Sequence, residues 1–418
     1  MSASQASVPA ILVIGTADTK ADELLFMRQS IVEAGGRVQM MDVGILGEAP
    51  FDPDLSKHEV ARAAGTTIEA IAALGDENAA MTEMARGAAA LALEQHASGR
   101  VQGMIALGGT MGTDLALDVA SALPIGVPKF VVSTVAFSHL IPPDRIAPDL
   151  MMILWAGGLY GLNDICRSAL SQAAGAVLGA ARARVAGSDT RPVIGMTSLG
   201  KSCLQYMVAL KPALEQRGFE LAVFHTTGMG GRAFESLARQ GFFAAVMDFS
   251  LQELANDLNG SVVTAGADRL EGAGAAGVPQ IVAPGAVDLI DMPTWQGVPQ
   301  RHAGRGYHAH NRLIASVNMT SHERRLAARA IADKLAAARG PTRFILPLRG
   351  IEEWDRPGEA LHDPEGLDAF IDEVRKTLRP PAQLVELDAH INDPAFVELV
   401  LASFDEWVRE GVIRGAGS

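Results

Sequence analysis

Cysteine is almost absent from this chain of 418 residues, which contains only Cys166 and Cys203. Two isolated cysteines form neither a disulfide framework nor a CxxC zinc motif, so the composition fits a reducing compartment. Long apolar runs are also missing. No window reaches the roughly 18 apolar residues of a membrane-spanning helix, and residues 1–9 have no basic segment that leads into an apolar one. We therefore expect a cytoplasmic protein that does not enter a membrane.

Positive charge is scarce as well. Lys and Arg together number 35 against 48 Asp and Glu, which gives a net charge of −13. Such a chain lacks the basic surface by which proteins hold nucleic acids or anionic membranes without specificity, so we expect neither as a partner. Hydrophobic residues make up 48% of the chain, which excludes global disorder. The 43 glycines exceed the usual share, and they cluster in a few loops.

Short apolar segments alternate with helical patterns along the chain. Residues 9–15 predict a buried parallel strand, a helical pattern follows up to Gly35, and residues 38–43 predict the next strand. The same plan returns over residues 192–224. Further strands are expected at 344–348 and 383–387, and further helices at 364–378 and 394–408. This alternation is typical of α/β folds with parallel sheets.

The chain is expected to form two domains. An Ala- and Gly-rich helical stretch over residues 159–184 is followed by the polar segment 185–191, which predicts a linker. We therefore expect two Rossmann-like α/β domains with mainly parallel sheets, residues 1–188 and 189–418. Because open α/β sheets bind ligands at the carboxyl ends of their strands, we expect the ligand cleft between the two domains.

A glycine-rich loop follows an apolar strand in the first domain. Residues 101–113 have the sequence VQGMIALGGTMGT, and a helical pattern begins at Asp114. The N–H groups of such a loop and the positive end of a helix suit a phosphate or a carboxylate. A tight turn that needs positive φ explains the glycines equally well. The candidate ligand residues here are Gly108, Gly109, Thr110, Gly112 and Thr113.

The second domain contains a loop with the letters of a P-loop. Residues 195–202, GMTSLGKS, match G-x-x-x-x-G-K-[ST] between an apolar strand and a helical pattern. In that arrangement Lys201 contacts phosphate oxygens and Ser202 reaches Mg²⁺, and the apolar run 242–248 supplies a partner carboxylate. A chance match is the alternative in a chain of this size. The candidate ligand residues are Thr197, Ser198, Gly200, Lys201, Ser202 and Asp248.

Two further loops of the second domain join glycine with charged residues. They are HTTGMGGR at 225–232 and AGADRLE at 265–271. An arginine can grip a phosphate with two hydrogen bonds, whereas Asp268 serves equally well as a helix N-cap. We expect these loops to meet at one edge of the sheet. The candidate ligand residues are Thr226, Thr227, Gly228, Gly230, Gly231, Arg232, Gly266, Ala267, Asp268 and Arg269.

Four polar residues, His302, His308, His310 and Asn311, lie in one segment. Their spacing is irregular and no acidic residue adjoins them, so we expect a polar loop near the site and no metal centre. The nucleophile motif G-x-S-x-G does not occur, and no dinucleotide-binding fingerprint is present. The candidates for acid or base catalysis are Asp18, Lys20, His225, Asp268 and His310.

The ordered series of motifs resembles the UPF0261 family, the Tm-1-like ATP-binding proteins. The strings that carry the resemblance are GTADTKADEL at 15–24, ALGGTMGT at 106–113, VFHTTGMGGRAFESL at 223–237, VMDFSLQELANDL at 246–258 and AGADRLEGAGAAGVPQIVAPGAVDLIDM at 265–292. Further matches at 41–47, 345–355 and 388–396 extend it over nearly the whole chain. The resemblance implies two Rossmann-like domains, a homodimer and ATP held mainly by the second domain. The family differs from this chain at residues 200–202, where it has small or apolar residues and threonines.

Three functional hypotheses follow. The first is an ATP-binding protein, with Mg²⁺ as a possible companion, that acts as an ATP-dependent enzyme on a small carboxylate or related metabolite. The second is a hydrolase, lyase or isomerase that binds a small anionic metabolite in the same loops without a nucleotide. The third is a non-catalytic dimer that binds ATP. A shared fold does not choose among them.

Overall fold

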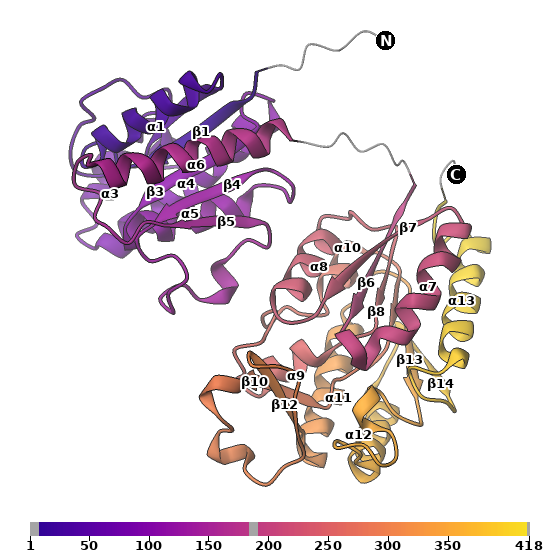
Figure 1. Ribbon diagram of the computed structural model, residues 1–418. Helices are drawn as coiled ribbons and strands as arrows, with labels where there is room; N and C mark the ends of the chain where they lie inside the picture. The colour runs from indigo at the N-terminus through magenta and orange to yellow at the C-terminus, as the bar shows by residue number, and fades with distance from the viewer. Residues whose placement is uncertain (1–7, 184–190, 416–418) are drawn as a thin grey trace. The chain divides into compact units, whose positions relative to one another are not determined.

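The computed structural model describes residues 8–183 and 191–415 (Figure 1). The side chains of Ser202 and Leu204 lie outside the description as well. The chain divides into two compact units, Met1–Ala186 and Gly187–Ser418. The predicted domain boundary near residue 188 falls among residues 184–190, outside the described residues. Each unit is presented by itself below.

Unit 1 is built on a five-stranded parallel sheet with the order β2-β1-β3-β4-β5. The strands are β1 (Ala10–Gly15), β2 (Arg37–Asp42), β3 (Gly103–Gly108), β4 (Lys129–Ser133) and β5 (Leu150–Leu154). The helices are α1 (Ala21–Glu33), α2 (Lys57–Ala63), α3 (Ile68–Ala72), α4 (Glu77–Ala97), α5 (Thr110–Ala122) and α6 (Asp164–Arg182). A 3₁₀ turn, η1 (Pro143–Arg145), precedes β5.

Helices cover both faces of this sheet because successive strand residues point to opposite sides. In β1, Ile11 and Val13 pack with the core residues of α1 and α6. Leu12 and Ile14 pack with those of α2, α4 and α5. All four residues are buried, as expected for a parallel sheet with helices on both sides.

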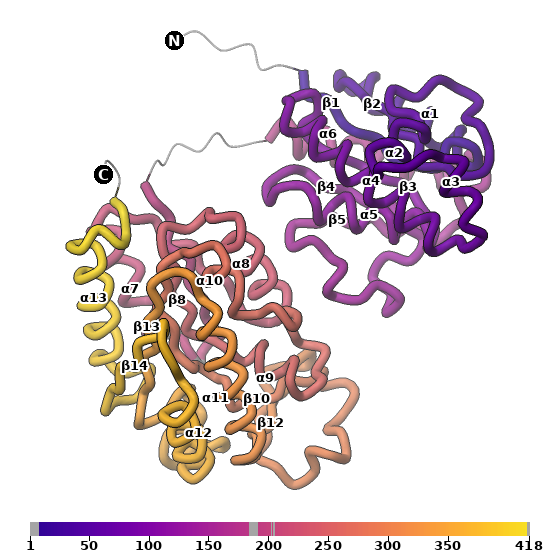
Figure 2. The backbone as a smooth tube through the Cα atoms, turned by 180° about the vertical axis from the view of Figure 1, so that it is seen from behind, coloured from indigo at the N-terminus to yellow at the C-terminus, as the bar shows by residue number. Residues whose placement is uncertain are grey.

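Unit 2 contains a six-stranded parallel sheet, β14-β13-β9-β8-β6-β7, and a separate antiparallel sheet, β10-β12-β11. Figure 2 shows β10 and β12 at some remove from β8, β13 and β14. The parallel strands are β6 (Val193–Ser198), β7 (Glu220–His225), β8 (Ala245–Asp248), β9 (Gln280–Val282), β13 (Thr342–Pro347) and β14 (Ala382–Leu387). The antiparallel strands are β10 (Leu289–Pro293), β11 (Tyr307–Ala309) and β12 (Ile314–Asn318).

The helices of unit 2 also cover both faces of the large sheet. One face packs against α7 (Leu204–Gln216) and α13 (Pro394–Arg409). The other packs against α8 (Met229–Arg239), α10 (Gly272–Ala276), α11 (Ser321–Ala336) and α12 (Pro364–Thr377). The shorter elements are α9 (Gln252–Leu258), η2 (Gly200–Cys203), η3 (Thr294–Gln296), η4 (Gln300–His302) and η5 (Glu353–Asp355).

The predicted α/β class with mainly parallel sheets is confirmed. One local prediction is wrong, because the histidine-bearing segment is not simply a loop. Tyr307–Ala309 pairs with β12, so His308 lies on a strand, and His310 begins the turn that closes the hairpin through its N–H bond to the Ile314 carbonyl, 3.1 Å. Strands of three residues contain too few side chains to show an alternating pattern. Among the described residues, no helix is both long enough and apolar enough to cross a membrane.

Candidate functional site

A cavity of unit 1 lies where the chain changes direction across the sheet. The chain passes from β1 to β2 on one side and later enters β3 on the other side of β1. Such a switch point leaves a crevice at the carboxyl ends of the two central strands. The cavity has a volume of about 520 Å³ and is lined by the segments that follow β1, β2 and β3. This volume falls within the range of small-molecule sites.

Two charged side chains line the cavity at the end of β1. Lys20 precedes α1, and its Nζ lies 6.0 Å from the centre of the Tyr160 ring. No carboxylate of the described residues lies within 4.0 Å of Lys20 Nζ. Asp18 accepts a hydrogen bond from the Gly47 N–H at Oδ2, 3.1 Å, while its buried Oδ1 has no partner among the described residues. Among the described residues, Lys20 is therefore a cation without an ion pair, and the carboxylates of Asp76 and Glu77 line the same cavity as Asp18.

The N-terminus of α5 opens onto the same cavity. Gly109 is the N-cap, no side chain caps the helix, and its first turn has no acidic residue. The first intrahelical bond at this end is donated by Thr113 N–H to the Gly109 carbonyl, 2.9 Å. The N–H groups of residues 110–112 precede it and lack partners within the helix. Together with the helix dipole they form a place for an anion.

The remaining walls of the cavity combine apolar residues with the acids Asp76 and Glu77, which lie at the start of α4. The apolar residues include Val43, Ile45, Ile71, Ala80 and Met81. A partly apolar chamber with an anion-binding end suits a ligand that has both a flat or aliphatic part and a phosphate or carboxylate.

The predicted residues of the first domain divide into two groups. Asp18, Lys20, Gly109, Thr110 and Gly112 line the cavity together. Gly108 and Thr113 do not line the cavity. Thr113 is buried, and its hydroxyl lies 2.7 Å from that of Ser133. A Cβ on Gly108 would lie 2.5 Å from the backbone carbon of Gly112, so glycine is required for the close approach of β3 and α5.

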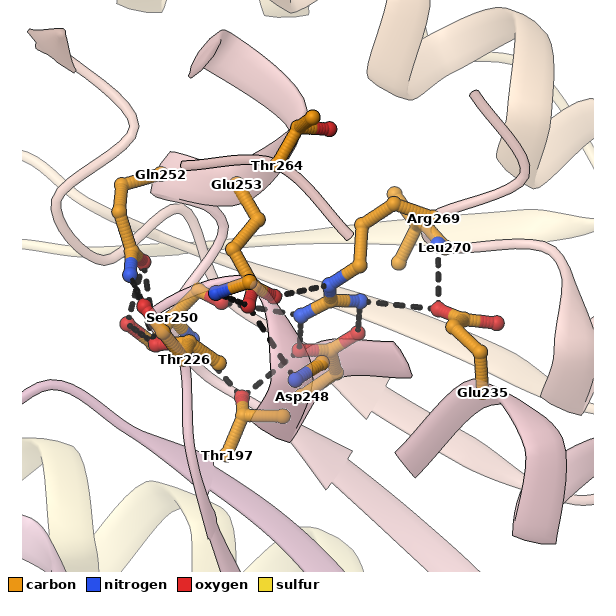
Figure 3. Close-up of polar contacts among 12 residues, drawn as sticks. Thr197, Thr226, Glu235, Asp248, Ser250, Gln252, Glu253, Thr264, Arg269 and Leu270 are labelled. Carbon is orange, nitrogen blue, oxygen red and sulfur yellow. Dashed lines mark hydrogen bonds and ion pairs between the residues drawn. The ribbon is translucent and has the colours of Figure 1, made fainter. Parts of the chain in front are cut away.

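In unit 2 the predicted ligands Asp248 and Arg269 bind each other in the interior (Figure 3). Arg269 donates to both carboxylate oxygens of Asp248, at 2.5 and 2.7 Å. It also donates to Glu235 and Glu253 and to the Ser250 carbonyl, each at 3.0 Å. All five N–H donors of the guanidinium are used, so Arg269 has none left for a ligand.

The predicted threonines reinforce this buried cluster (Figure 3). Thr197 donates to Asp248, 2.7 Å, and accepts from the N–H groups of Phe249 and Ser250, 2.9 and 3.0 Å. The Thr226 hydroxyl donates to the Ser198 carbonyl, 3.2 Å. The loops that follow β6, β7 and β8 are thereby held together, which is the convergence expected from the sequence.

The N-terminus of α8 is occupied by a carboxylate of the protein itself. Glu253 Oε1 accepts from the N–H groups of Gly228 and Gly231, at 2.5 and 3.2 Å. Burial raises the pKa of Glu253 to about 7, and Arg269 and the two N–H groups oppose this rise. Glu253 thus fills the place that the sequence suggested for an external phosphate.

Two of the three acids that bind Arg269, Glu235 and Glu253, were not predicted from the sequence. Glu235 and Glu253 are almost fully buried, and burial also raises the pKa of Glu235. The available signal was an acid in an apolar run, since Leu251, Leu254 and Ala255 around Glu253 are buried too.

The other predicted residues of unit 2 lie around this cluster. Lys201, His225 and Thr227 are exposed. Arg232 is half-buried, and its Nε has no hydrogen-bond partner among the described residues. Asp268 pairs with Arg239, 2.8 Å. The remaining positions have structural contacts: Ser198 donates to the Cys203 carbonyl, Ala267 accepts from Lys334, Gly200, Gly228 and Gly266 have positive φ, and a Cβ on Gly230 would collide with the His225 carbonyl. The side chain of Ser202 lies outside the described residues.

A third group of polar residues lies beyond β13. Burial and the carboxylates of Asp288 and Asp355 raise the pKa of Glu352 to about 10, so this side chain is neutral at pH 7. Asp288 pairs with Arg324, 3.1 Å, and Asp355 with His390, 2.9 Å. Among the described residues no set of three His, Cys, Asp or Glu side chains is placed to hold a metal ion.

The fold and the glycine loops at the strand ends define a two-unit, Rossmann-like α/β protein. The chain belongs to the UPF0261 family. The model of the uncharacterised protein family UPF0261 N-terminal domain matches residues 9–186, and that of its C-terminal domain matches residues 191–408.

The relatives share nearly the whole chain. A UPF0261 protein of Brucella melitensis is 60% identical over 405 residues, which cover 97% of both chains. A UPF0261 protein of Clostridium tetani is 34% identical over 388 residues, covering 92% of this chain and 96% of that protein. The ToMV resistance protein Tm-1 of Solanum lycopersicum is 30% identical and covers 97% of this chain, which matches 57% of the tomato protein.

Proposed function

We propose that this protein binds a nucleoside phosphate, ATP, in the cavity of unit 1. The observation that carries the proposal is that the uncapped N-terminus of α5 and Lys20, a cation without an ion pair among the described residues, line the same cavity. The family resemblance points to ATP as the ligand but implies the second domain as its place, whereas the cavity that has a volume suited to a small molecule lies in unit 1.

The part of the proposed site that would bind the phosphates is better defined than the part that would bind the base. Backbone N–H groups at a helix N-terminus and a lysine are a recurring combination for phosphate. The negative net charge of the chain does not oppose this, because the cation and the N–H groups are concentrated locally in the cavity.

The apolar walls suit the base of a nucleotide. Val43, Ile45, Ile71 and Met81 provide them. Asp18 is the carboxylate that would hold a Mg²⁺ brought by the phosphates, and this ion would neutralise their charge.

Unit 2 supports nucleotide binding less well. Its α8 N-terminus is filled by Glu253, and all donors of Arg269 are used. The loop at residues 200–202 has an exposed lysine, but a 3₁₀ turn with positive φ at Gly200, η2, stands between β6 and α7.

Two lysine variants of the full-length protein separate the two locations. Titration calorimetry with MgATP should show that Lys20→Met weakens binding about 10- to 100-fold, the equivalent of one charged hydrogen bond. Lys201→Met is the matched control and should bind like the wild type. Loss of binding in Lys201→Met with none in Lys20→Met would move the nucleotide to unit 2.

The same titrations with ADP, AMP and pyrophosphate test the nucleoside part. We expect ATP to bind more tightly than pyrophosphate, because only ATP fills the apolar walls. Equal binding of pyrophosphate would favour a small phosphorylated metabolite, and no binding of any of the four would contradict an anion site in this cavity.

A further inference from the structure

Unit 2 contains a chain of three polar side chains that runs from its interior to the half-buried His310. Asp291 on β10 and Ser316 on β12 are directly opposite in the antiparallel sheet. The Ser316 hydroxyl donates to Asp291 Oδ1, and it lies 2.7 Å from His310 Nε2. None of these residues belongs to the nucleotide site proposed above, which lies in unit 1.

The innermost of the three side chains, Asp291, is a carboxylate without a neighbouring cation. Asp291 is 1% exposed, and Asn256 donates to its Oδ2, 3.0 Å. No Lys, Arg or His of the described residues forms an ion pair with it. Burial raises the pKa of Asp291. A buried charge without a counterion is costly, so this carboxylate is a ready proton acceptor.

The outermost of the three side chains, His310, is an imidazole whose protonated form is disfavoured. Burial and the neighbouring His308 lower the pKa of His310 to about 4. The His310 ring lies against Trp354, with ring centres 4.6 Å apart. No described residue bonds to His310 Nδ1, and this atom is not among the buried polar atoms that lack a partner, so Nδ1 is open to solvent.

We propose that Asp291, Ser316 and His310 form a proton relay that takes a proton at His310 Nδ1 from the hydroxyl group of a small molecule, or from water, beside Trp354. An O–H bond of the ligand breaks and an N–H bond forms at Nδ1. The Nε2 proton passes to Ser316 Oγ, and the Ser316 proton passes to Asp291 Oδ1. The negative charge moves from Asp291 to the ligand oxygen, and His310 stays neutral throughout.

The relay explains how a poorly basic histidine can act as a base. Direct protonation would create an imidazolium in a site that disfavours it, whereas the relay neutralises a buried carboxylate instead. Ser316 is 0% exposed and therefore cannot itself attack a substrate. His310 is the residue that meets the ligand, and Ser316 and Asp291 are positioning residues.

The surroundings contain few other groups that titrate. His308 faces His310 from β11, with ring centres 4.8 Å apart, and Glu359 acts on His308. Trp354 lies against both histidine rings and contributes no charge, and its backbone N–H donates to Oε2 of the neutral Glu352, 2.7 Å. The pH response of His310 should therefore follow Asp291 and His308.

The test uses full-length protein with ¹⁵N-labelled histidine, titrated from pH 8 to pH 4 by NMR, with infrared spectra of the carboxyl groups in parallel. His310→Gln assigns the signals. We expect His310 to begin as the Nε2–H tautomer and to become the Nδ1–H tautomer, with a carboxylic acid band appearing at the same midpoint. An ordinary exposed imidazole becomes doubly protonated near pH 6.5 instead.

Two variants connect these signals to the proposed residues. Asp291→Asn retains the size of the side chain and should lose both the acid band and the tautomer change. Ser316→Ala should keep the band but separate its midpoint from that of His310. A His310 that is doubly protonated above pH 5 in the wild type, or a difference spectrum between the wild type and Asp291→Asn that shows no carboxylic acid band, would overturn the relay. Because no nucleotide enters this test, its outcome is independent of the ATP titrations.

Discussion

Replacing Arg269 by leucine should destabilise unit 2 strongly and in a pH-dependent way. One guanidinium serves Asp248, Glu235 and Glu253, all buried. Without it, carboxylates that remain inside the protein must take up protons. Removing one partner of a buried ion pair costs about 3–5 kcal/mol in comparable cases.

The magnitude can be worked out from the protons involved. Glu253 has a pKa of about 7, so the cluster already holds part of a proton at neutral pH. Arg269→Leu forces at least one more carboxyl to be neutral. Because an unfolded carboxyl has a pKa of about 4, this costs about 4 kcal/mol at pH 7, three pH units at about 1.4 kcal/mol each. At pH 5 the same step costs about 1.4 kcal/mol.

The direction of the pH dependence of stability follows from proton linkage. A carboxyl whose folded pKa lies above its unfolded pKa contributes most to stability at low pH, and the contribution falls as the pH rises from about 4. The variant should therefore lose more stability at pH 7 than at pH 5. Urea unfolding of the full chain at both values, followed by tryptophan fluorescence, measures this, since Trp295, Trp354 and Trp407 lie in unit 2.

Arg349→Leu is the matched control. Arg349 pairs with Asp388 at the surface, where their side chains are 67% and 68% exposed. The same substitution there should change the free energy of unfolding by less than about 1 kcal/mol. A loss below about 1 kcal/mol in Arg269→Leu at pH 7, or equal losses at pH 5 and pH 7, would refute the reasoning.

Two other predictions concern packing and protonation. Gly108→Ala should lower the free energy of unfolding by about 1–3 kcal/mol, because its Cβ would press on Gly112. Gly175→Ala lies in open space within α6 and should raise the free energy of unfolding by about 0.5–1 kcal/mol. Thermal unfolding of both variants measures these changes. Glu352→Gln should be nearly neutral in stability near pH 4.5 and stabilising at pH 7, because the wild type must keep Glu352 protonated at a pH where the unfolded carboxyl is ionised. Since its raised pKa of about 10 makes the wild type lose stability as the pH rises above about 4.5, melting temperatures from pH 6 to pH 9 should fall more steeply in the wild type than in Glu352→Gln, and equal slopes would contradict a neutral Glu352.

Much of the fold could be predicted from the sequence. The apolar run before Gly15 and the segment that precedes Asp248 form central strands of their sheets. These strands are covered on both faces, so nearly every residue is apolar and the signal is strong. The strand β11 escaped prediction because its three residues alternate between exposed and half-buried positions.

The candidate site was predictable in its loops but not in its pairings. Lys20 and Gly109 stand out as a cation and a glycine at strand ends. The burial of Arg269 could not be foreseen, because arginine is seldom fully buried and its partners Glu235 and Glu253 are 34 and 16 residues away. Such partners are brought together only by the packing of α8 and α9.

The carboxylate at the start of α8 shows that one sequence pattern can have two opposite uses. A glycine loop before a helix can bind an external anion when its N–H groups have no partner. When an acid of the same chain accepts their hydrogen bonds, the same loop stabilises the fold instead. In this protein the choice at Gly228 depends on Glu253, which lies 25 residues downstream. Searches for phosphate loops in related chains would therefore gain from asking whether an internal acid stands at that distance. Where a neutral residue replaces this acid, the N–H groups lose their internal partner and can bind an external anion.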